Sequence, residues 1–113
     1  MTDAPNIDIS PPQWEIVRAI LQRHIPDREV WAFGSRVTGT ARQYSDLDLV
    51  IFGDEPVGLA VMSALREDFS ESELPFKVDL VEWATTGAAF RKVIEKDKVV
   101  IKGQGNRLNR LDS

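Results

Sequence analysis

Apolar residues recur along this chain with two different periods. Between residues 14 and 21 they return every three or four positions, which is typical of a helix with one apolar face. Ser10 and Gln13 have the spacing of a capping box, and two prolines occupy the first turn. We therefore expect a helix from residue 11 to about residue 24, and Pro26 prevents it from continuing.

Three further apolar runs are typical of strands in their length and in their content of Val, Leu, Ile and aromatic residues. They cover residues 29–33, 46–52 and 76–83. In the second run, apolar residues fill one face, whereas Asp46 and Asp48 begin the other. Because strand side chains alternate between faces, both aspartates are expected to point the same way.

The remaining pattern adds two helices and one more short strand. Residues 57–69 fit a helix, and a later helix carries Phe90, Val93 and Ile94 on one face. Residues 99–101 are expected to form a short edge strand. This order of elements predicts an α/β or α+β fold, in which a small sheet of about three to four strands packs against helices.

Length and composition narrow the class of protein. The chain has 113 residues, 42% of them hydrophobic and 28% charged, so one domain is expected over residues 1–102. Residues 103–113, rich in Asn, Gly and Arg, are expected to form a frayed tail. A net charge of −4 gives no support for tight binding to nucleic acid. The lack of cysteine, signal-peptide pattern and long apolar run favours a cytoplasmic protein without a membrane span.

Three carboxylates, Asp46, Asp48 and Asp79, lie within apolar strand sequence. An ionised group is costly there unless it is paired or binds a cation. Two aspartates on one strand and a third on its neighbour supply the oxygen ligands that Mg²⁺ prefers, and such a cluster suits two ions and phosphoryl transfer. The alternatives are a turn aspartate for Asp46 and a structural partner of an arginine for Asp48.

Gly34 and Ser35 follow the first strand run directly. A glycine there lets the backbone approach a phosphate closely, and the serine offers a hydroxyl and an N–H group. An ordinary strand-ending turn explains the pair equally well when it is taken alone. The combination favours a functional site over chance. Ten residues follow Ser35, then Asp-x-Asp begins a strand, and a lone aspartate lies on a third strand.

The segment from Trp31 to Val50 closely resembles the Gly-Ser-x₁₀-Asp-x-Asp signature of the minimal nucleotidyltransferases, a branch of the DNA polymerase β-like superfamily. Residues 78–81 match the strand that carries that family's third carboxylate. The resemblance implies a mixed sheet with the two motif strands antiparallel. It also implies that Asp46 and Asp48 bind the metal, and that Asp79 completes the metal site and accepts the proton of an acceptor hydroxyl.

The same resemblance implies a nucleotide site. Gly34 and Ser35 would bind the terminal phosphates of a nucleoside triphosphate, with ATP the expected one, in the presence of two Mg²⁺ ions. Arg36 would neutralise phosphate charge. The alternative for Arg36 is a surface arginine paired with a strand-start aspartate.

The implied function is transfer of a nucleoside monophosphate, expected to be AMP, to an acceptor hydroxyl with release of pyrophosphate. Short family members act with a separate helical-bundle protein of the HEPN-like or substrate-binding type, so such a partner or self-association is expected, marked by an exposed apolar patch. The alternative is an antitoxin-like module that neutralises a HEPN-type helical toxin by occlusion. A sugar transferase fits poorly, because it leaves Gly34 and Ser35 without a role.

Overall fold

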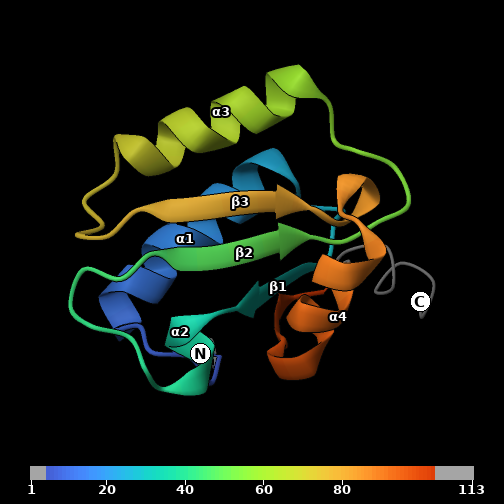
Figure 1. Ribbon diagram of the computed structural model, residues 1–113. Coiled ribbons are helices and arrows are strands. Elements are labelled where there is room, and N and C mark those ends of the chain that lie inside the picture. Colours follow the sequence, from blue (N-terminus) through green and yellow to red (C-terminus); the bar gives the residue numbers. More distant parts are fainter. Residues whose placement is uncertain (1–4, 104–113) are drawn as a thin grey trace, which may run out of the picture.

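The computed structural model describes residues 5–103, which build one sheet and the helices around it (Figure 1). In chain order the elements are α1 (Pro11–His24), β1 (Val30–Phe33), α2 (Ser35–Thr38), β2 (Leu47–Ile51), α3 (Leu59–Ser70), β3 (Val78–Glu82), the 3-10 turn η1 (Trp83–Thr85), α4 (Ala88–Asp97) and β4 (Val99–Lys102). Of the predicted tail, residues 103–113, all but Gly103 lies outside the described residues.

The sheet has the strand order β3-β2-β1-β4. Both β2 and β4 run antiparallel to β1, whereas β3 runs parallel to β2. A parallel pair needs a crossover connection, and α3 supplies it. The expected small mixed sheet, with antiparallel motif strands and a short edge strand near residue 100, is therefore confirmed.

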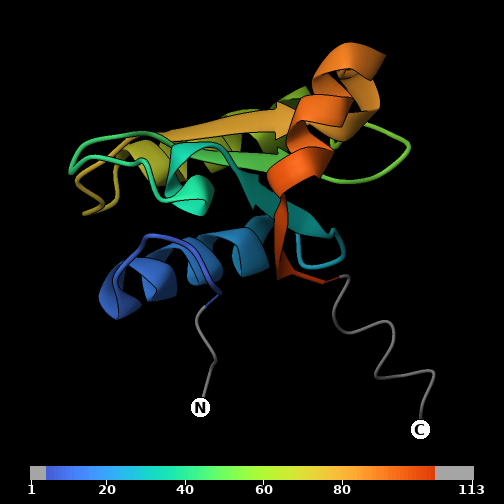
Figure 2. The ribbon, with the colours of Figure 1, turned by 60° about the horizontal axis from the view of Figure 1, so that its bottom comes forward.

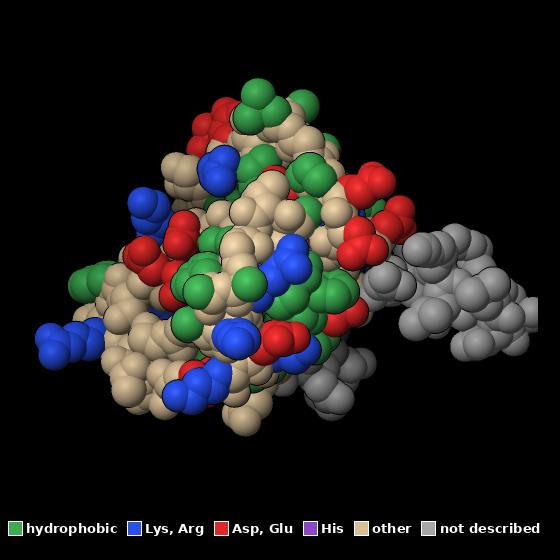
Figure 3. Space-filling model, turned by 45° about the vertical axis from the view of Figure 1, so that its right-hand side comes forward, with side chains coloured by type: hydrophobic (Ala, Val, Ile, Leu, Met, Phe, Trp, Pro, Cys, Tyr) green, Lys and Arg blue, Asp and Glu red, His purple; other side chains and the backbone are tan. Residues whose placement is uncertain are grey.

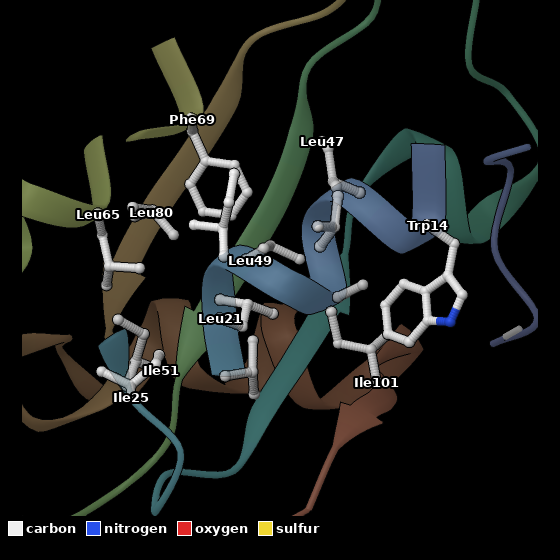
Figure 4. Packing of buried hydrophobic residues seen from close by; sticks show 14 of the residues in the cluster. Trp14, Leu21, Ile25, Leu47, Leu49, Ile51, Leu65, Phe69, Leu80 and Ile101 are labelled. Carbon is white, nitrogen blue, oxygen red and sulfur yellow. The ribbon is translucent and has the colours of Figure 1, made fainter. Parts of the chain in front are cut away.

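One face of the sheet carries the main core. Leu47, Leu49 and Ile51 of β2 point to this face and are almost fully buried, as their alternation with polar positions predicts. They meet Leu21 of α1 and Leu65 of α3, as Figure 4 shows. The capping box predicted at the start of α1 is present, with the Ser10 side chain accepting from the Gln13 N–H.

The opposite face is covered only in part. A smaller cluster there joins Trp31 and Phe33 of β1, Val50 of β2 and Ile94 of α4. Figure 2 shows α4 on the side of the sheet away from α1. Because Asp48 lies between Leu47 and Leu49, its side chain emerges on this second face, and α4 leaves the beginning of β2 uncovered.

Some details differ from the sequence predictions. The link after Gly34 is a single helical turn, α2, because Gly39 in the left-handed region ends it at once. The strands are shorter than the apolar runs, so Asp46 precedes β2 instead of opening it. On α4 only Ile94 is buried, whereas Phe90 and Val93 are 42% and 57% exposed.

Large apolar side chains reach the surface at a few positions, namely Tyr44, Leu59, Phe90, Val93 and Val100. Figure 3, which faces the side that carries α4, shows hydrophobic side chains among basic and acidic ones. Within residues 5–103, no helix is long and apolar enough to cross a lipid bilayer.

Candidate active site

Strand pairing brings the predicted site residues to one end of the sheet. Phe33, the last residue of β1, lies opposite Asp48, and Asp48 lies opposite Asp79 of the parallel strand β3. The end of β1 and the beginnings of β2 and β3 therefore meet, at the left of Figure 1. Residues that are directly opposite have side chains on the same face, within about 5.5 Å at Cβ, so Asp48 and Asp79 are close neighbours.

Gly34 lies against the Asp48 carboxylate. A Cβ atom built on Gly34 would lie 2.3 Å from Asp48 Oδ2, so any other residue would force the Asp48 carboxylate to move. The backbone of Gly34 also has φ 83° and ψ −158°, a conformation that is essentially restricted to glycine. Glycine is thus favoured here for two independent reasons, and it lets the chain turn from β1 into α2 directly beside Asp48.

The electrostatics of Asp48 reflect this crowding. The pKa of Asp48 is raised from 3.8 to about 6, first by burial and then by the negative charges of Asp79 and Asp46. Asp46 and Asp79 are exposed, whereas Asp48 is half-buried. The site therefore holds more negative charge than it can easily accommodate, which is the condition that a bound cation relieves.

The structure brings the three predicted metal ligands together without closing them into a cage. Among residues 5–103, no three His, Cys, Asp or Glu side chains are close enough to enclose an ion on their own. The donor set nevertheless fits Mg²⁺, which prefers carboxylate oxygen and is usually bound by one or two carboxylates while water and substrate phosphates complete its shell. An open carboxylate site of this kind leaves room for such phosphates.

Ser35 begins α2 and is half-buried next to Gly34. Its carbonyl accepts hydrogen bonds from the N–H groups of Gly39 and Thr40, so it helps to close the turn. As the first residue of the helix, Ser35 has an N–H group with no acceptor inside the helix. Ser35 directly follows Gly34, which lies against Asp48, and its contact with phosphate stays a prediction.

Arg36 occupies a different place from the one that the sequence predicts. It is 5% exposed, and its guanidinium donates to the backbone carbonyls of Ser45 at 3.0 Å, Asp8 at 2.9 Å, Arg42 at 3.3 Å and Gln43 at 3.0 Å. It also stacks on the ring of Phe76, 4.0 Å from the ring centroid.

Arg36 is therefore neither a phosphate-facing side chain nor a surface arginine paired with an aspartate, because its donors are occupied by main-chain oxygens. These oxygens belong to residues 42–45, the irregular segment that leads to Asp46, and to the segment before α1. The burial of Arg36 carried no signal in the sequence. We assign it to holding the loop that delivers Asp46.

Comparison with protein families shows the class of protein to which this chain belongs. A model of the nucleotidyltransferase domain matches residues 14–101, and the chain belongs to this family of enzymes. This confirms the resemblance indicated by the Gly-Ser and Asp-x-Asp motifs. Among individual proteins, the chain is 51% identical over 102 residues to "Probable protein adenylyltransferase MntA" of Haemophilus influenzae, and the match covers 90% of each chain.

Two solved structures share the fold. One is the crystal structure of a toxin–antitoxin complex with AMP-PNP, which matches 79% of this chain and 72% of that chain with a TM-score of 0.67 and 21% identity. The other is a tri-AMPylated Shewanella oneidensis HEPN toxin in complex with an MNT antitoxin, which matches 85% of this chain and 72% of that chain with a TM-score of 0.60 and 18% identity.

Replacing Gly34 tests the close approach to Asp48. Gly34→Ala should reduce nucleotidyl transfer at least about a hundredfold, because the new methyl group displaces the carboxylate. Gly39→Ala is the control: Gly39 has a similar φ of 85° but nothing within 4 Å of the added Cβ. It should lose about 1–2 kcal/mol of stability and keep its activity. Equal losses of activity in both variants would contradict this account.

Asp48→Asn should stabilise the protein in EDTA at pH 7. The pKa of Asp48 in the folded protein is about 6, above the ordinary 3.8. Its protonated form therefore leaves the free energy of unfolding at its full value below pH 4, and its ionisation lowers that free energy as the pH rises through 6. Solvent screening at this half-buried site reduces the gain from Asn to about 1–2 kcal/mol. Urea unfolding at pH 4 and pH 7.5 measures it; a gain that is the same at both pH values would refute the explanation.

Arg36→Lys should cost about 2–4 kcal/mol of unfolding free energy, because one ammonium group cannot satisfy four backbone carbonyls. Arg18→Lys is the matched control, since Arg18 is exposed and bonds only to Glu15 on its own helix. It should change stability by less than about 0.5 kcal/mol. Denaturant unfolding of the three proteins makes the comparison, and a near-neutral Arg36→Lys would show that the loop does not depend on the guanidinium.

Proposed function

We propose that this chain transfers AMP from ATP to a hydroxyl group of a separate protein, in a reaction that requires Mg²⁺ and releases pyrophosphate. The observation that carries the proposal is the juxtaposition of Gly34 with Asp48 and of Asp48 with Asp79 at one end of the sheet. Membership of the nucleotidyltransferase family supplies the reaction class.

Asp46, Asp48 and Asp79 are the residues that would hold two Mg²⁺ ions. When bound, the ions supply positive charge that polarises the phosphate and stabilises both the attacking and the leaving oxygen. The raised pKa of Asp48, caused by burial and by its two acidic neighbours, supports this assignment. No salt bridge joins these three carboxylates to a Lys or Arg of residues 5–103, so the cluster is suited to a metal–nucleotide complex.

The other residues position the reactants. Gly34 lets the main chain approach the nucleotide, and Ser35 donates to the terminal phosphates through its hydroxyl and N–H groups. Asp79 is exposed at the edge of the site, so it can meet a hydroxyl that arrives from solvent. It accepts the proton of that hydroxyl as the oxygen attacks the α-phosphorus, and the bond to the pyrophosphate oxygen breaks.

The acceptor is proposed to belong to a helical HEPN-type protein. The relative of 51% identity is named a protein adenylyltransferase, and one structure with the same fold contains an AMPylated HEPN toxin. The described residues, 5–103, form one sheet with its helices, and we propose that the partner provides the acceptor. Such a pair would work as a toxin and an antitoxin.

The test is transfer of radiolabel from α-labelled ATP to a purified HEPN-type helical protein in the presence of this chain. With Mg²⁺ we expect labelled partner protein, and we expect none in EDTA. Asp48→Asn and Asp79→Asn should each reduce the rate at least about a hundredfold, because a lost ligand or base removes several kcal/mol of transition-state stabilisation.

Asp54→Asn is the matched control, since Asp54 lies beyond the other end of β2. It should transfer label at the normal rate. Absence of labelling by the unmodified chain, or labelling that survives Asp48→Asn, would refute the proposed reaction. Full protection from the toxin by Asp48→Asn would instead favour neutralisation by occlusion.

A further inference from the structure

The outer edge of β3 is a free sheet edge beside the candidate active site. β3 is the last strand of the sheet, and within residues 5–103 only β2 pairs with it. The carbonyl of Lys77 accepts from Leu47 N–H on β2. Because backbone groups alternate in direction along a strand, residues 77, 79 and 81 direct their N–H and C=O groups toward β2. Val78 and Leu80 direct their N–H and C=O groups outward, toward the free edge.

A groove runs along this edge between β3 and α3. Its first part has a volume of about 540 Å³ and its lining includes Phe69, Phe76, Leu80 and Asp79. A second hollow of about 540 Å³ continues past Arg66 toward Glu82. Figure 1 shows α3 extending beyond β3, and its buried residues share the main core cluster with those of α1, so both helices lie on the same side of the sheet. An additional strand at the edge would therefore rest on α3 as the present strands rest on α1.

The groove carries charged side chains of both signs. Its first part is lined by Arg66 and Lys77 together with Asp79, and its second part by Arg66 and Glu82. Arg66, which lines both parts, forms no salt bridge with another residue of the described range, 5–103. The apolar floor and this unpaired cation together favour a segment that carries apolar side chains and an acidic one.

We infer that an extended segment of the acceptor protein adds to the free edge of β3 as a fifth strand and thereby places its hydroxyl beside Asp79. This inference rests on the proposed function and specifies how the acceptor is recognised. The outward N–H and C=O groups of Val78 and Leu80 supply the main-chain hydrogen bonds that such strand addition uses.

The register explains why the hydroxyl reaches the right face. Asp79 directs its backbone groups to β2, so a residue opposite it on an antiparallel neighbour forms a non-hydrogen-bonded pair, in which side chains lie closest. Both side chains of that pair lie on the same face, which for Asp79 is the face of Asp48. The neighbours on either side of the hydroxyl residue point the other way, into the groove between β3 and α3.

The acceptor segment therefore has a definite pattern. A Ser, Thr or Tyr occupies the position opposite Asp79, and the residues before and after it are apolar or acidic. The pattern combines strand alternation with the lining of the groove.

Val78→Pro tests the main-chain contact. Val78 N–H points away from β2, so proline removes a donor at the free edge without removing a bond inside the sheet. With the HEPN-type protein as acceptor, we expect the acceptor KM to rise about tenfold or more, from the lost hydrogen bond and the added ring, while kcat and ATP affinity change little. Val78→Ala, which keeps the N–H group, is the control and should retain the normal KM.

Hydrogen exchange of the unmodified chain gives a second readout that does not depend on how the variant folds. In the complex with the HEPN-type protein and AMP-PNP, the amides of Val78 and Leu80 should exchange at least about tenfold more slowly than in the chain with AMP-PNP alone. Label transfer that proceeds with unchanged exchange at both amides would overturn this inference and leave the proposed function intact. Absence of transfer by the unmodified chain would overturn both.

Discussion

The contact between Gly34 and the Asp48 carboxylate is the constraint on which the rest of the site depends. It exists because β1 and β2 pair in a register that sets Phe33 opposite Asp48. The parallel pairing of β3 in turn sets Asp79 opposite Asp48. A shift of one residue in either pairing would send one of these side chains to the apolar face. The buried leucines of β2 prevent that shift, so the core that stabilises the fold also aligns the carboxylates of the candidate site.

The residues of the site also lower the stability of the fold. Asp48 is half-buried between two other acids, which raises its pKa, and the loop before Asp46 has no regular structure. The buried Arg36 compensates by donating to four backbone carbonyls of this loop and of the segment before α1. The three carboxylates repel one another, and the loop that leads to Asp46 is held by one guanidinium. The site is therefore suited to a ligand that brings positive charge.

Much of this arrangement could be predicted from the sequence, for identifiable reasons. The alternation of Asp46 and Asp48 with Leu47 and Leu49 predicted which face of β2 is buried, and the Gly-Ser and Asp-x-Asp spacing indicated the family. The place of Arg36 could not be predicted, since its partners are backbone carbonyls distant in sequence. Asp79 also differs, because it looked enclosed by apolar neighbours but lies exposed on an edge strand. Which strand lies at the edge of the sheet depends on how the strands pair, and the local sequence of a strand does not determine its partners.

The most direct test of the account is an NMR titration of the Asp48 carboxyl carbon, first in EDTA and then with Mg²⁺ and AMP-PNP. We predict a midpoint near pH 6 without the cation and a clearly lower midpoint with it, because a bound cation stabilises the carboxylate. An ordinary midpoint of about 3.9 that does not respond to Mg²⁺ would contradict the claim that the three carboxylates form one metal-dependent site.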